Sequence, residues 1–350
     1  MTQVCVVGAG VIGASVAYYL TQRGLKPVVV DAVGPACAAS GKAGGFLARD
    51  WSDGSPSAPL AHESFALHTE LAEKLDGKNK YGYRRVAAYS VSIRPGKASE
   101  RPAGGRRLTS DLTWLNQDNL VESTQIGDEE SCAQLHPARF TKTLLEEVTR
   151  AGGSVRVGRV TGIKIQGGQV YGVKLVDRQG APCGFVSADV VAHSVVVRDV
   201  SAGAIPAAVL FLAYRGSDGK SQEPEVYPRP DGEVYICGGS SSSALPDYAD
   251  EVAPDEGTPA RLREIGAAVS PFLEPDAAET LAEQACFLPC SPTGLPVIGA
   301  IPGVKGAFVA AGHSVWGILN APVTGLAIAE LIVDGHTNVV PLQAFDPALS

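Results

Sequence analysis

Residues 2–31 read TQVCVVGAGVIGASVAYYLTQRGLKPVVVD, and this stretch decides the fold. Its apolar runs and glycines predict a strand, a turn, a helix and a second strand, at residues 2–7, 8–13, 14–22 and 27–30. Gly8 allows the tight turn, Gly10 lets a phosphate approach the backbone, and Gly13 lets the helix pack closely on the strand. The helix N-terminus offers N–H groups to phosphates, and Asp31 lies at the spacing from which a carboxylate accepts ribose hydroxyls. The stretch therefore predicts a dinucleotide-binding βαβ unit, without separating FAD from NAD.

The length and composition are those of an ordinary globular protein of two domains. The 350 residues are 45% hydrophobic and 19% charged, and the formal net charge of −8 argues against nucleic acid or an anionic membrane surface as the main partner. No apolar run reaches the length of a membrane span, and no signal peptide precedes the first strand. The seven cysteines, an odd number, are expected to be reduced thiols. We therefore expect a cytoplasmic protein.

Behind the opening unit, helical and β-rich stretches follow one another. Helical spacing predicts helices at residues 60–75, 138–151, 258–268 and 316–333. Alternation predicts strands at residues 81–92, 154–157, 160–165, 170–176, 185–191, 207–214, 225–228, 233–237, 296–298 and 307–311, with an exposed loop at 95–107. This order favours an α/β fold with a discontinuous nucleotide-binding domain, residues 1–80, 131–192 and 286–350. A substrate domain built on an antiparallel sheet, residues 81–130 and 193–285, would be inserted into it.

Motifs spread over most of the chain carry a family resemblance. They occur in this order: VGAGVIGAS at 7–15, SGKAGG at 40–45, YPRPDG at 227–232, GLPVIG at 294–299 and GHSVWGI at 312–318. Together they resemble the FAD-dependent D-amino acid oxidase superfamily, which includes glycine, sarcosine and pipecolate oxidases. The likeness is closest to a less characterised branch of fungal and plant FAD-dependent oxidoreductases. The resemblance implies a Rossmann-like FAD-binding domain of the glutathione-reductase type with an inserted antiparallel-sheet substrate domain.

The resemblance also implies how FAD is held. The loop Ser40–Leu47 should wrap the pyrophosphate and the flavin edge, where Lys42 either offsets phosphate charge or is a solvated loop lysine. The helix expected after Gly312 would point its N-terminus at the pyrimidine end of the flavin and stabilise the reduced anion; because of Pro322, its regular part is expected to begin nearer Asn320. The implied cofactor-binding residues are Gly8, Gly10, Val11, Ile12, Gly13, Asp31, Ser40, Gly41, Lys42, Ala43, Gly44, Gly45, Val160 (for the adenine), Cys286, Gly312, His313, Trp316, Gly317, Ile318 and Leu319.

Cys286 has three interpretations that stay open at this point. By the resemblance, it falls where some relatives carry the cysteine that bonds covalently to the flavin. It is otherwise a buried small thiol or a redox partner of Cys290. A C-x3-C pair alone does not indicate zinc. The remaining histidines, which show no triad or metal spacing, are His62, His68, His136, His193 and His336. No metal site is therefore predicted.

The catalytic candidates are His313 and Arg229. His313 is either a catalytic side chain or a loop residue whose backbone matters more than its ring. Arg229, with Arg84 and Arg85 as further candidates, could hold a substrate carboxylate because guanidinium binds carboxylate through two hydrogen bonds. Each of these arginines is otherwise a surface or turn residue.

One stretch departs from the family pattern. Residues 188–191 begin a strand of the nucleotide-binding domain, but the chain then passes directly into residues 192–198, which resemble a later segment. A strand end and a loop are missing there, and that strand end normally packs near the flavin phosphates.

These observations predict an FAD-dependent oxidoreductase. It would take a hydride from the carbon next to the nitrogen of a small amine or amino acid and pass the electrons to O2. The missing strand favours a second hypothesis, a degenerate flavoprotein with a binding or trafficking role. An NAD-dependent dehydrogenase is a third hypothesis, against which the segment around His313 argues.

Overall fold

The computed structural model of the protein describes residues 4–97, 112–178, 190–199 and 205–349. Its α-helices are α1 (Val11–Gln22), α2 (Ala39–Lys42), α3 (Ala58–Lys74), α4 (Gly77–Tyr81), α5 (Pro137–Arg150), α6 (Thr258–Val269) and α7 (Gly317–Asp334). Its strands are β1 (Cys5–Val7), β2 (Val28–Asp31), β3 (Phe46–Ala48), β4 (Arg84–Arg85), β5 (Ala87–Ile93), β6 (Leu120–Gly127), β7 (Cys132–Gln134), β8 (Ser154–Val157), β9 (Arg159–Gln166), β10 (Gln169–Val176), β11 (Val190–Asp199), β12 (Ala208–Arg215), β13 (Ser221–Gln222), β14 (Glu225–Pro228), β15 (Glu233–Ser241), β16 (Ala278–Leu288), β17 (Val297–Ala300) and β18 (Phe308–Ala311).

The expected βαβ unit is present. Strands β1, β2 and β8 pair in parallel, and α1 connects the first two. Helix α1 begins three residues earlier than expected, because the Gly10 backbone is extended and its carbonyl accepts the N–H of Ala14 to close the first turn. Gly8 has a φ of 103°, which favours glycine, and a Cβ on Gly13 would overlap the Gly8 carbonyl. The glycines therefore have the structural roles that their spacing predicts.

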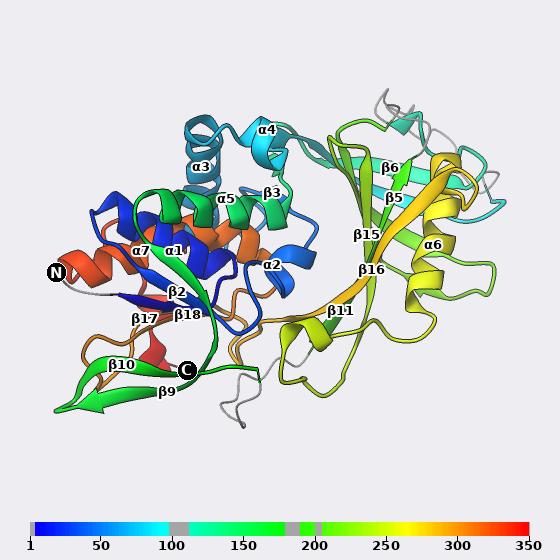
Figure 1. The fold of residues 1–350 in the computed structure, drawn as a ribbon. Coiled ribbons are helices and arrows are strands. Elements are labelled where there is room, and N and C mark those ends of the chain that lie inside the picture. Colours follow the sequence, from blue (N-terminus) through cyan, green and yellow to red (C-terminus); the bar gives the residue numbers. More distant parts are fainter. Residues whose placement is uncertain (1–3, 98–111, 179–189, 200–204, 350) are drawn as a thin grey trace.

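The second large element is a mixed sheet with the strand order β16-β11-β15-β14-β12-β5-β6, to which β13 adds beside β12 (Figure 1). The sequence predicts an antiparallel sheet here, and this is wrong at one pairing. Strands β5 and β12 run parallel, with Ala87 beside Ala208. Strand β5 is antiparallel to β6, and β12 is antiparallel to β14. The sheet therefore consists of two antiparallel groups of strands that join at the parallel pair of β5 and β12.

Strand β16 was not expected from the sequence. Its residues, AETLAEQACFL, include many that favour helix, and its first half is largely exposed. It is nevertheless a strand, because it pairs along nearly its whole length with β11. Here tertiary pairing outweighs local propensity.

The break in the family pattern has a structural counterpart. Val190 and Val191 belong to β11, a single strand that runs to Asp199 between β15 and β16. The expectation that they begin a strand of the nucleotide-binding sheet is wrong; residues 185–189 of the same expected strand lie outside the described residues, as do 98–107 of the expected loop. Strand β18 pairs with β17 in a separate ladder. Within the described ranges, no strand therefore pairs with the outer edge of β1.

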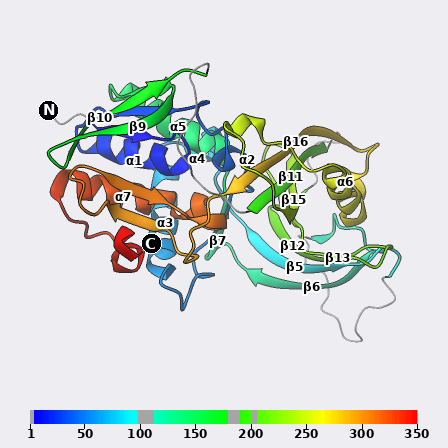
Figure 2. The same ribbon diagram turned by 90° about the horizontal axis from the view of Figure 1, so that it is seen from below.

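Among the described residues the buried side chains form two large hydrophobic cores and a smaller one, which includes Tyr227 and Tyr235 on the side of the mixed sheet that borders a cavity. The first large core lies among β1, β2 and the helices α1, α3, α5 and α7, and the second between the mixed sheet and α6. Figure 2 shows the helices of the first core on one side and the mixed sheet on the other. Helices α1 and α7 cross so closely that a Cβ on Gly325 would overlap the backbone of Ser15.

Helix α7 begins at Gly317, and the expected start near Asn320 is wrong. Pro322 consequently lies inside the helix, where it has no N–H to donate to the carbonyl of Ile318. A proline in this position normally breaks or kinks a helix and destabilises it by about 3 kcal/mol. The carbonyl groups of the first turn must therefore find donors outside α7.

Helix α3 supplies a donor to the Ile318 and Leu319 carbonyl groups, His68, and an acceptor to the Val323 N–H, Ser64. The buried ring of His68 places Nε2 2.9 Å from the carbonyl oxygen of Ile318 and 3.1 Å from that of Leu319. The N–H of Val323 donates to Ser64 Oγ at 3.2 Å, which leaves the Leu319 carbonyl to His68. Burial lowers the pKa of His68 to about 4, so the ring stays neutral at neutral pH. These contacts explain why α7 tolerates its proline.

By length and composition alone, residues Ser314–Asp334 could cross a membrane, with a mean hydropathy of 1.5. In the structure 61% of that window is buried within the first core. The apolar character of α7 is thus accounted for by packing against α1 and α3.

Candidate active site

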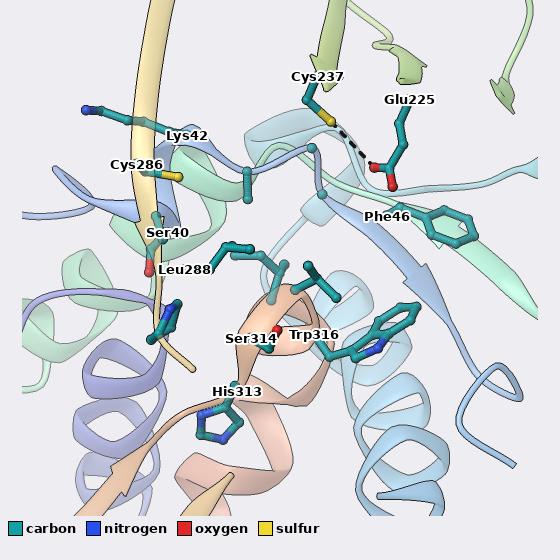
Figure 3. A pocket seen from close by; sticks show the side chains of 18 of the residues that line it. Ser40, Lys42, Phe46, Glu225, Cys237, Cys286, Leu288, His313, Ser314 and Trp316 are labelled. Carbon is teal, nitrogen blue, oxygen red and sulfur yellow. Dashed lines mark hydrogen bonds between the residues drawn. The ribbon is translucent and has the colours of Figure 1, made fainter. Parts of the chain in front are cut away.

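A cavity of about 880 Å³ lies where the N-termini of α1 and α7 meet β3, β14, β15 and β16. Its volume lies within the range of small-molecule and cofactor sites. Figure 3 shows that the side chains of its wall come from segments far apart in the sequence. The predicted residues in its wall are Val11, Ile12, Ser40, Lys42, Ala43, Gly44, Gly45, Cys286, Gly312, His313, Trp316, Gly317 and Ile318. The predicted residues outside it are Gly8, Gly10, Gly13, Asp31, Gly41, Val160, Arg229 and Leu319.

The start of α1 provides polar groups beside this cavity. Ser40 Oγ accepts the N–H of Val11 at 2.9 Å, which ties the Ser40 loop to the helix N-terminus. Asp31 Oδ2 accepts the N–H of Ala9 at 2.8 Å, and Oδ1 accepts two further N–H groups, those of Val33 and Gly34. The carboxylate is held in place by three hydrogen bonds and keeps acceptor capacity for one more. This arrangement suits the ribose and phosphates of a dinucleotide.

The loop between Ser40 and Gly45 packs against the mixed sheet. Lys42 Nζ donates to the carbonyl of Ala285 in β16 at 2.8 Å, so Lys42 is not simply solvated. Tyr235 OH donates to the carbonyl of Lys42 at 2.9 Å. A Cβ on Gly44 would overlap the ring of Tyr227, so only glycine allows this contact without a shift. The loop therefore connects the βαβ unit to the sheet that forms the opposite wall.

His313 directs its ring away from the cavity (Figure 3). The ring is buried, and Nε2 lies 3.0 Å from Thr324 Oγ1 in α7. Burial lowers the pKa of His313 to about 4. Gly312 and Ser314, on either side, both have positive φ, which turns the backbone sharply into the helix start. This geometry favours the interpretation in which the backbone of His313, and not its ring, serves the site.

Cys286 lies in the cavity wall and Cys290 just beyond it. Burial raises the pKa of Cys286 to about 11, against the opposing effect of the Lys42 charge, so the thiol is protonated at neutral pH. Cys290 Sγ lies 3.7 Å from Ser314 Oγ. The cysteines that the structure describes are free, and no disulfide joins these two.

The arginines considered for a substrate carboxylate bind protein groups instead. Arg229 is buried behind Tyr235 and pairs with Glu233, Nη1 to Oε2, at 3.0 Å. Arg84 donates to Gln134 Oε1 and to the carbonyl of Pro228, and Arg85 donates to Thr69 Oγ1 at 3.0 Å. None of the three is among the described residues that line the cavity. The structure thus does not bring a guanidinium group to the cavity wall.

An aromatic cluster on the mixed-sheet side was not recognised from the sequence. The rings of Phe46, Trp51 and Phe211 lie within 5.3 Å of one another, centroid to centroid, and Phe46 stacks on Tyr227 at 6.2 Å. Trp51 also meets Trp316 edge to face at 6.3 Å. The alternation of side chains along β12 could have indicated that Phe211 faces the cavity. Leu210 and Leu212 face the second core, so Phe211 lies on the opposite side of the sheet.

Glu225 is the second residue that sequence reasoning missed. It begins β14, and its carboxylate faces the cavity (Figure 3). Tyr227 OH and Cys237 Sγ both donate to Oε2, the latter at 3.5 Å. Burial, followed by the Glu225 charge, holds the pKa of both donors well above their usual values, so they remain protonated. The two donors therefore fix one oxygen of the Glu225 carboxylate.

The described part of the site contains no cluster of metal-ligating side chains. In the ranges that the structure describes, no group of three or more His, Cys, Asp or Glu side chains could hold a metal ion. The polar side chains among the described lining residues include hydroxyls, thiols, one glutamine, one lysine, two glutamates and the buried His313.

A dinucleotide-binding βαβ unit that shares a large aromatic cavity with a second helix N-terminus defines the class of flavin-dependent oxidoreductases. The family model described as FAD dependent oxidoreductase matches residues 3–331, and the chain belongs to this family. FAD is accordingly its cofactor, and the N-terminus of α1, Asp31 and the adjoining cavity fit it.

Individual relatives agree with this assignment. The chain is 29% identical to an oxidoreductase of Schizosaccharomyces pombe over 391 aligned residues, which cover 98% of this chain and 97% of that protein. It is 26% identical to a glycine oxidase of Geobacillus kaustophilus, covering 94% and 92% of the two chains. The crystal structure of glycine oxidase from Geobacillus kaustophilus has a similar fold, with a TM-score of 0.75 at 22% identity over 99% of this chain and 98% of that one.

The first of these alignments bears on the missing strand. Its 391 positions exceed the 350 residues of this chain, so the relative has segments that this chain lacks. The alignment is thus longer than this chain, as expected for a chain that lacks a strand end and a loop of the family pattern.

Proposed function

We propose that this protein oxidises the C–N bond of a small amine or amino acid and passes the electrons to O2. The observation that carries the proposal is the meeting of the α1 N-terminus, the Ser40 loop and the α7 N-terminus at one cavity. A cavity with an aromatic wall excludes water from a reacting C–H bond. Glycine oxidases among the relatives, and a similarly folded iminodiacetate oxidase, act on substrates of this class.

We propose the following arrangement for FAD. The residues Gly8–Gly13 and Ser40–Gly45 hold the pyrophosphate, Asp31 the ribose, and the Val160 backbone the adenine. The start of α7, from Gly312 to Leu319, stabilises negative charge on the pyrimidine side of the flavin through its N–H groups. When bound, FAD supplies the hydride acceptor. The FAD domain, of the glutathione-reductase type, would comprise residues 1–80, 131–178 and 289–350, with 81–130 and 190–288 inserted for the substrate; the expected boundaries at 192 and 286 move because β11 and β16 lie wholly in the mixed sheet.

The chain's own residues position these parts. His313, bonded to Thr324, holds the backbone turn that aims the first N–H groups of α7 at the cavity. Lys42, bonded to β16, adds a positive charge to the wall near Cys286. Arg229 supports the site indirectly, because its guanidinium packs on the back of Tyr235 and pairs with Glu233.

The test is the flavin spectrum of the purified protein, followed by anaerobic bleaching with amines and a peroxide assay in air. We expect a yellow protein whose absorbance bleaches with a substrate of this class. A colourless protein that cannot be reconstituted with FAD would refute the proposal. Gly10→Ala should weaken FAD binding, because the new Cβ would crowd Ser40 Oγ at the phosphate approach, whereas Gly172→Ala, a position with open space in β10, should not.

A second candidate function is a flavoprotein that binds partners with little catalysis. The observation in its favour is that no strand among the described residues pairs with the outer edge of β1. Hydrogen peroxide formation above background across a panel of amines and amino acids would decide against it.

A further inference from the structure

We propose that the cavity selects amines without a carboxylate beside the nitrogen, and that Glu225 pairs with the substrate's ammonium group. The inference rests on the proposed function and narrows its substrate class. Its observations are a fixed carboxylate, an aromatic wall and the charges that surround them.

The carboxylate of Glu225 is prepared for a cation. Tyr227 and Cys237 both donate to Oε2, so this oxygen is an acceptor and the group is held in one orientation. In the part of the chain that the structure describes, Oε1 accepts no hydrogen bond and no basic side chain forms an ion pair with Glu225. A substrate N–H group can bond to it without displacing a protein partner, and such charge-assisted bonds are the strong ones.

The aromatic wall beside Glu225 also favours a cation. Tyr227 stacks between Phe46 and Tyr235, with interplanar angles of 9° and 13°, while Trp51 and Phe211 complete the cluster. The faces of aromatic rings attract cations; both faces of Tyr227 are covered by its stacked neighbours, so Trp51 and Phe211 are lining rings that can offer a face to a ligand. A cluster of rings around a carboxylate therefore favours an ammonium group over a carboxylate.

The other charges of the wall offer a substrate carboxylate little. Glu223 adds a second negative charge at an exposed position. Lys42 is the basic side chain among the described lining residues, and its Nζ is bonded to the Ala285 carbonyl on the β16 side. Arg229 is paired with Glu233 outside the wall. An α-amino acid would bring its own carboxylate toward Glu225, and no guanidinium among the described lining residues would offset the repulsion.

The test uses probes that cannot be oxidised. The carbon beside the nitrogen carries no hydrogen in tert-butylammonium or in 2-aminoisobutyrate, so calorimetric titration of the FAD-loaded protein measures binding alone. We expect tert-butylammonium to bind at least about ten-fold more tightly than 2-aminoisobutyrate or pivalate, its carboxylate analogue. Glu225→Gln should weaken tert-butylammonium binding by at least about ten-fold. Glu223→Gln, which removes the same charge at the exposed rim, should change it by less than about three-fold.

A second variant keeps the test decisive if Glu225→Gln does not fold. Phe211→Leu keeps the carboxylate and removes one ring, and should weaken tert-butylammonium binding by about three- to ten-fold. Equal or tighter binding of 2-aminoisobutyrate, or a Glu225→Gln protein that binds tert-butylammonium unchanged, would overturn the inference.

The two proposals fail differently. A protein that holds FAD and oxidises α-amino acids in preference to simple amines refutes the inference and leaves the proposed function in place. A protein that holds FAD and binds tert-butylammonium through Glu225, yet oxidises no amine, refutes the proposed function.

Discussion

Replacement of His68 by leucine tests how α7 is held at the cavity. In the folded protein, Nε2 of His68 is the donor that faces the carbonyl groups of Ile318 and Leu319, because Pro322 has no N–H and the N–H of Val323 is bonded to Ser64. Leucine fills the same space and donates nothing. A buried carbonyl left without a donor costs about 1–3 kcal/mol, so we expect His68→Leu to lower the free energy of unfolding by about 2–4 kcal/mol.

The measurement is urea unfolding followed by far-ultraviolet circular dichroism, with FAD at the same saturating concentration throughout. His62→Leu is the matched control, because His62 lies on the same helix with about half of its side chain exposed. A surface pair of this kind contributes about 0–1 kcal/mol. Pro322→Ala provides a second control: it restores an N–H that can bond to the Ile318 carbonyl, and should recover about 1–2 kcal/mol in the His68→Leu background.

The reasoning would be refuted by a His68→Leu protein within about 0.5 kcal/mol of the wild type. It would also be refuted if Pro322→Ala changed stability equally with His68 and with leucine, because the two sites would then not share a hydrogen bond.

Three further predictions follow from burial and close packing. Burial lowers the pKa of His68 and His313 from 6.5 to about 4, so the unfolded chain binds protons that the folded one does not. Stability is therefore full above pH 6.5 and falls as the pH drops toward 4, by about 3 kcal/mol for each ring, and urea titrations at a series of pH values should show this slope; a flat profile would contradict it. Gly44→Ala should weaken FAD binding by about ten-fold in equilibrium titrations, because the new Cβ displaces the Tyr227 ring or the loop; unchanged affinity would show that this packing does not shape the FAD site. Cys286 is protonated at neutral pH, with a pKa of about 11, so acid precipitation should release the flavin into the supernatant, and flavin that stays with the pellet would establish a covalent bond.

The parts of the fold that sequence reasoning predicted are those decided by local chemistry. Gly8 and Gly13 are required by backbone geometry within the βαβ unit, and the helices α3, α5 and α6 carry their apolar spacing in the sequence itself. The start of α7 was misplaced because Pro322 is acceptable there through His68 and Ser64 on α3, which lie 250 or more residues from their partners in the sequence. Strand β16 was missed for the same kind of reason, since its pairing with β11 is not encoded in its own residues.

The residues of the candidate site also fall into those that the sequence predicted and those that it did not. The glycine-rich segments before α1 and α7 could be recognised, because a phosphate or flavin requires the backbone to come close. Glu225 could not, because its importance depends on Tyr227, on Cys237 from the neighbouring strand and on rings from other segments. Arg229 was chosen for its guanidinium alone, and only the structure shows that Glu233 occupies it. Side chains act through their neighbours, which a single sequence does not place.

The crossing of α1 and α7 has a consequence for the length of ligand that the protein accepts. The first turn of each helix borders the cavity, and the two helices touch where Gly325 packs on the backbone of Ser15. The separation of the two positive helix ends is therefore set by this contact and not by the loops that precede the helices. Those loops can diverge between relatives while the span available to an extended, anionic molecule stays constant. Gly325→Ala should therefore change the distance between the two helix N-termini, because its Cβ would push α7 away from Ser15.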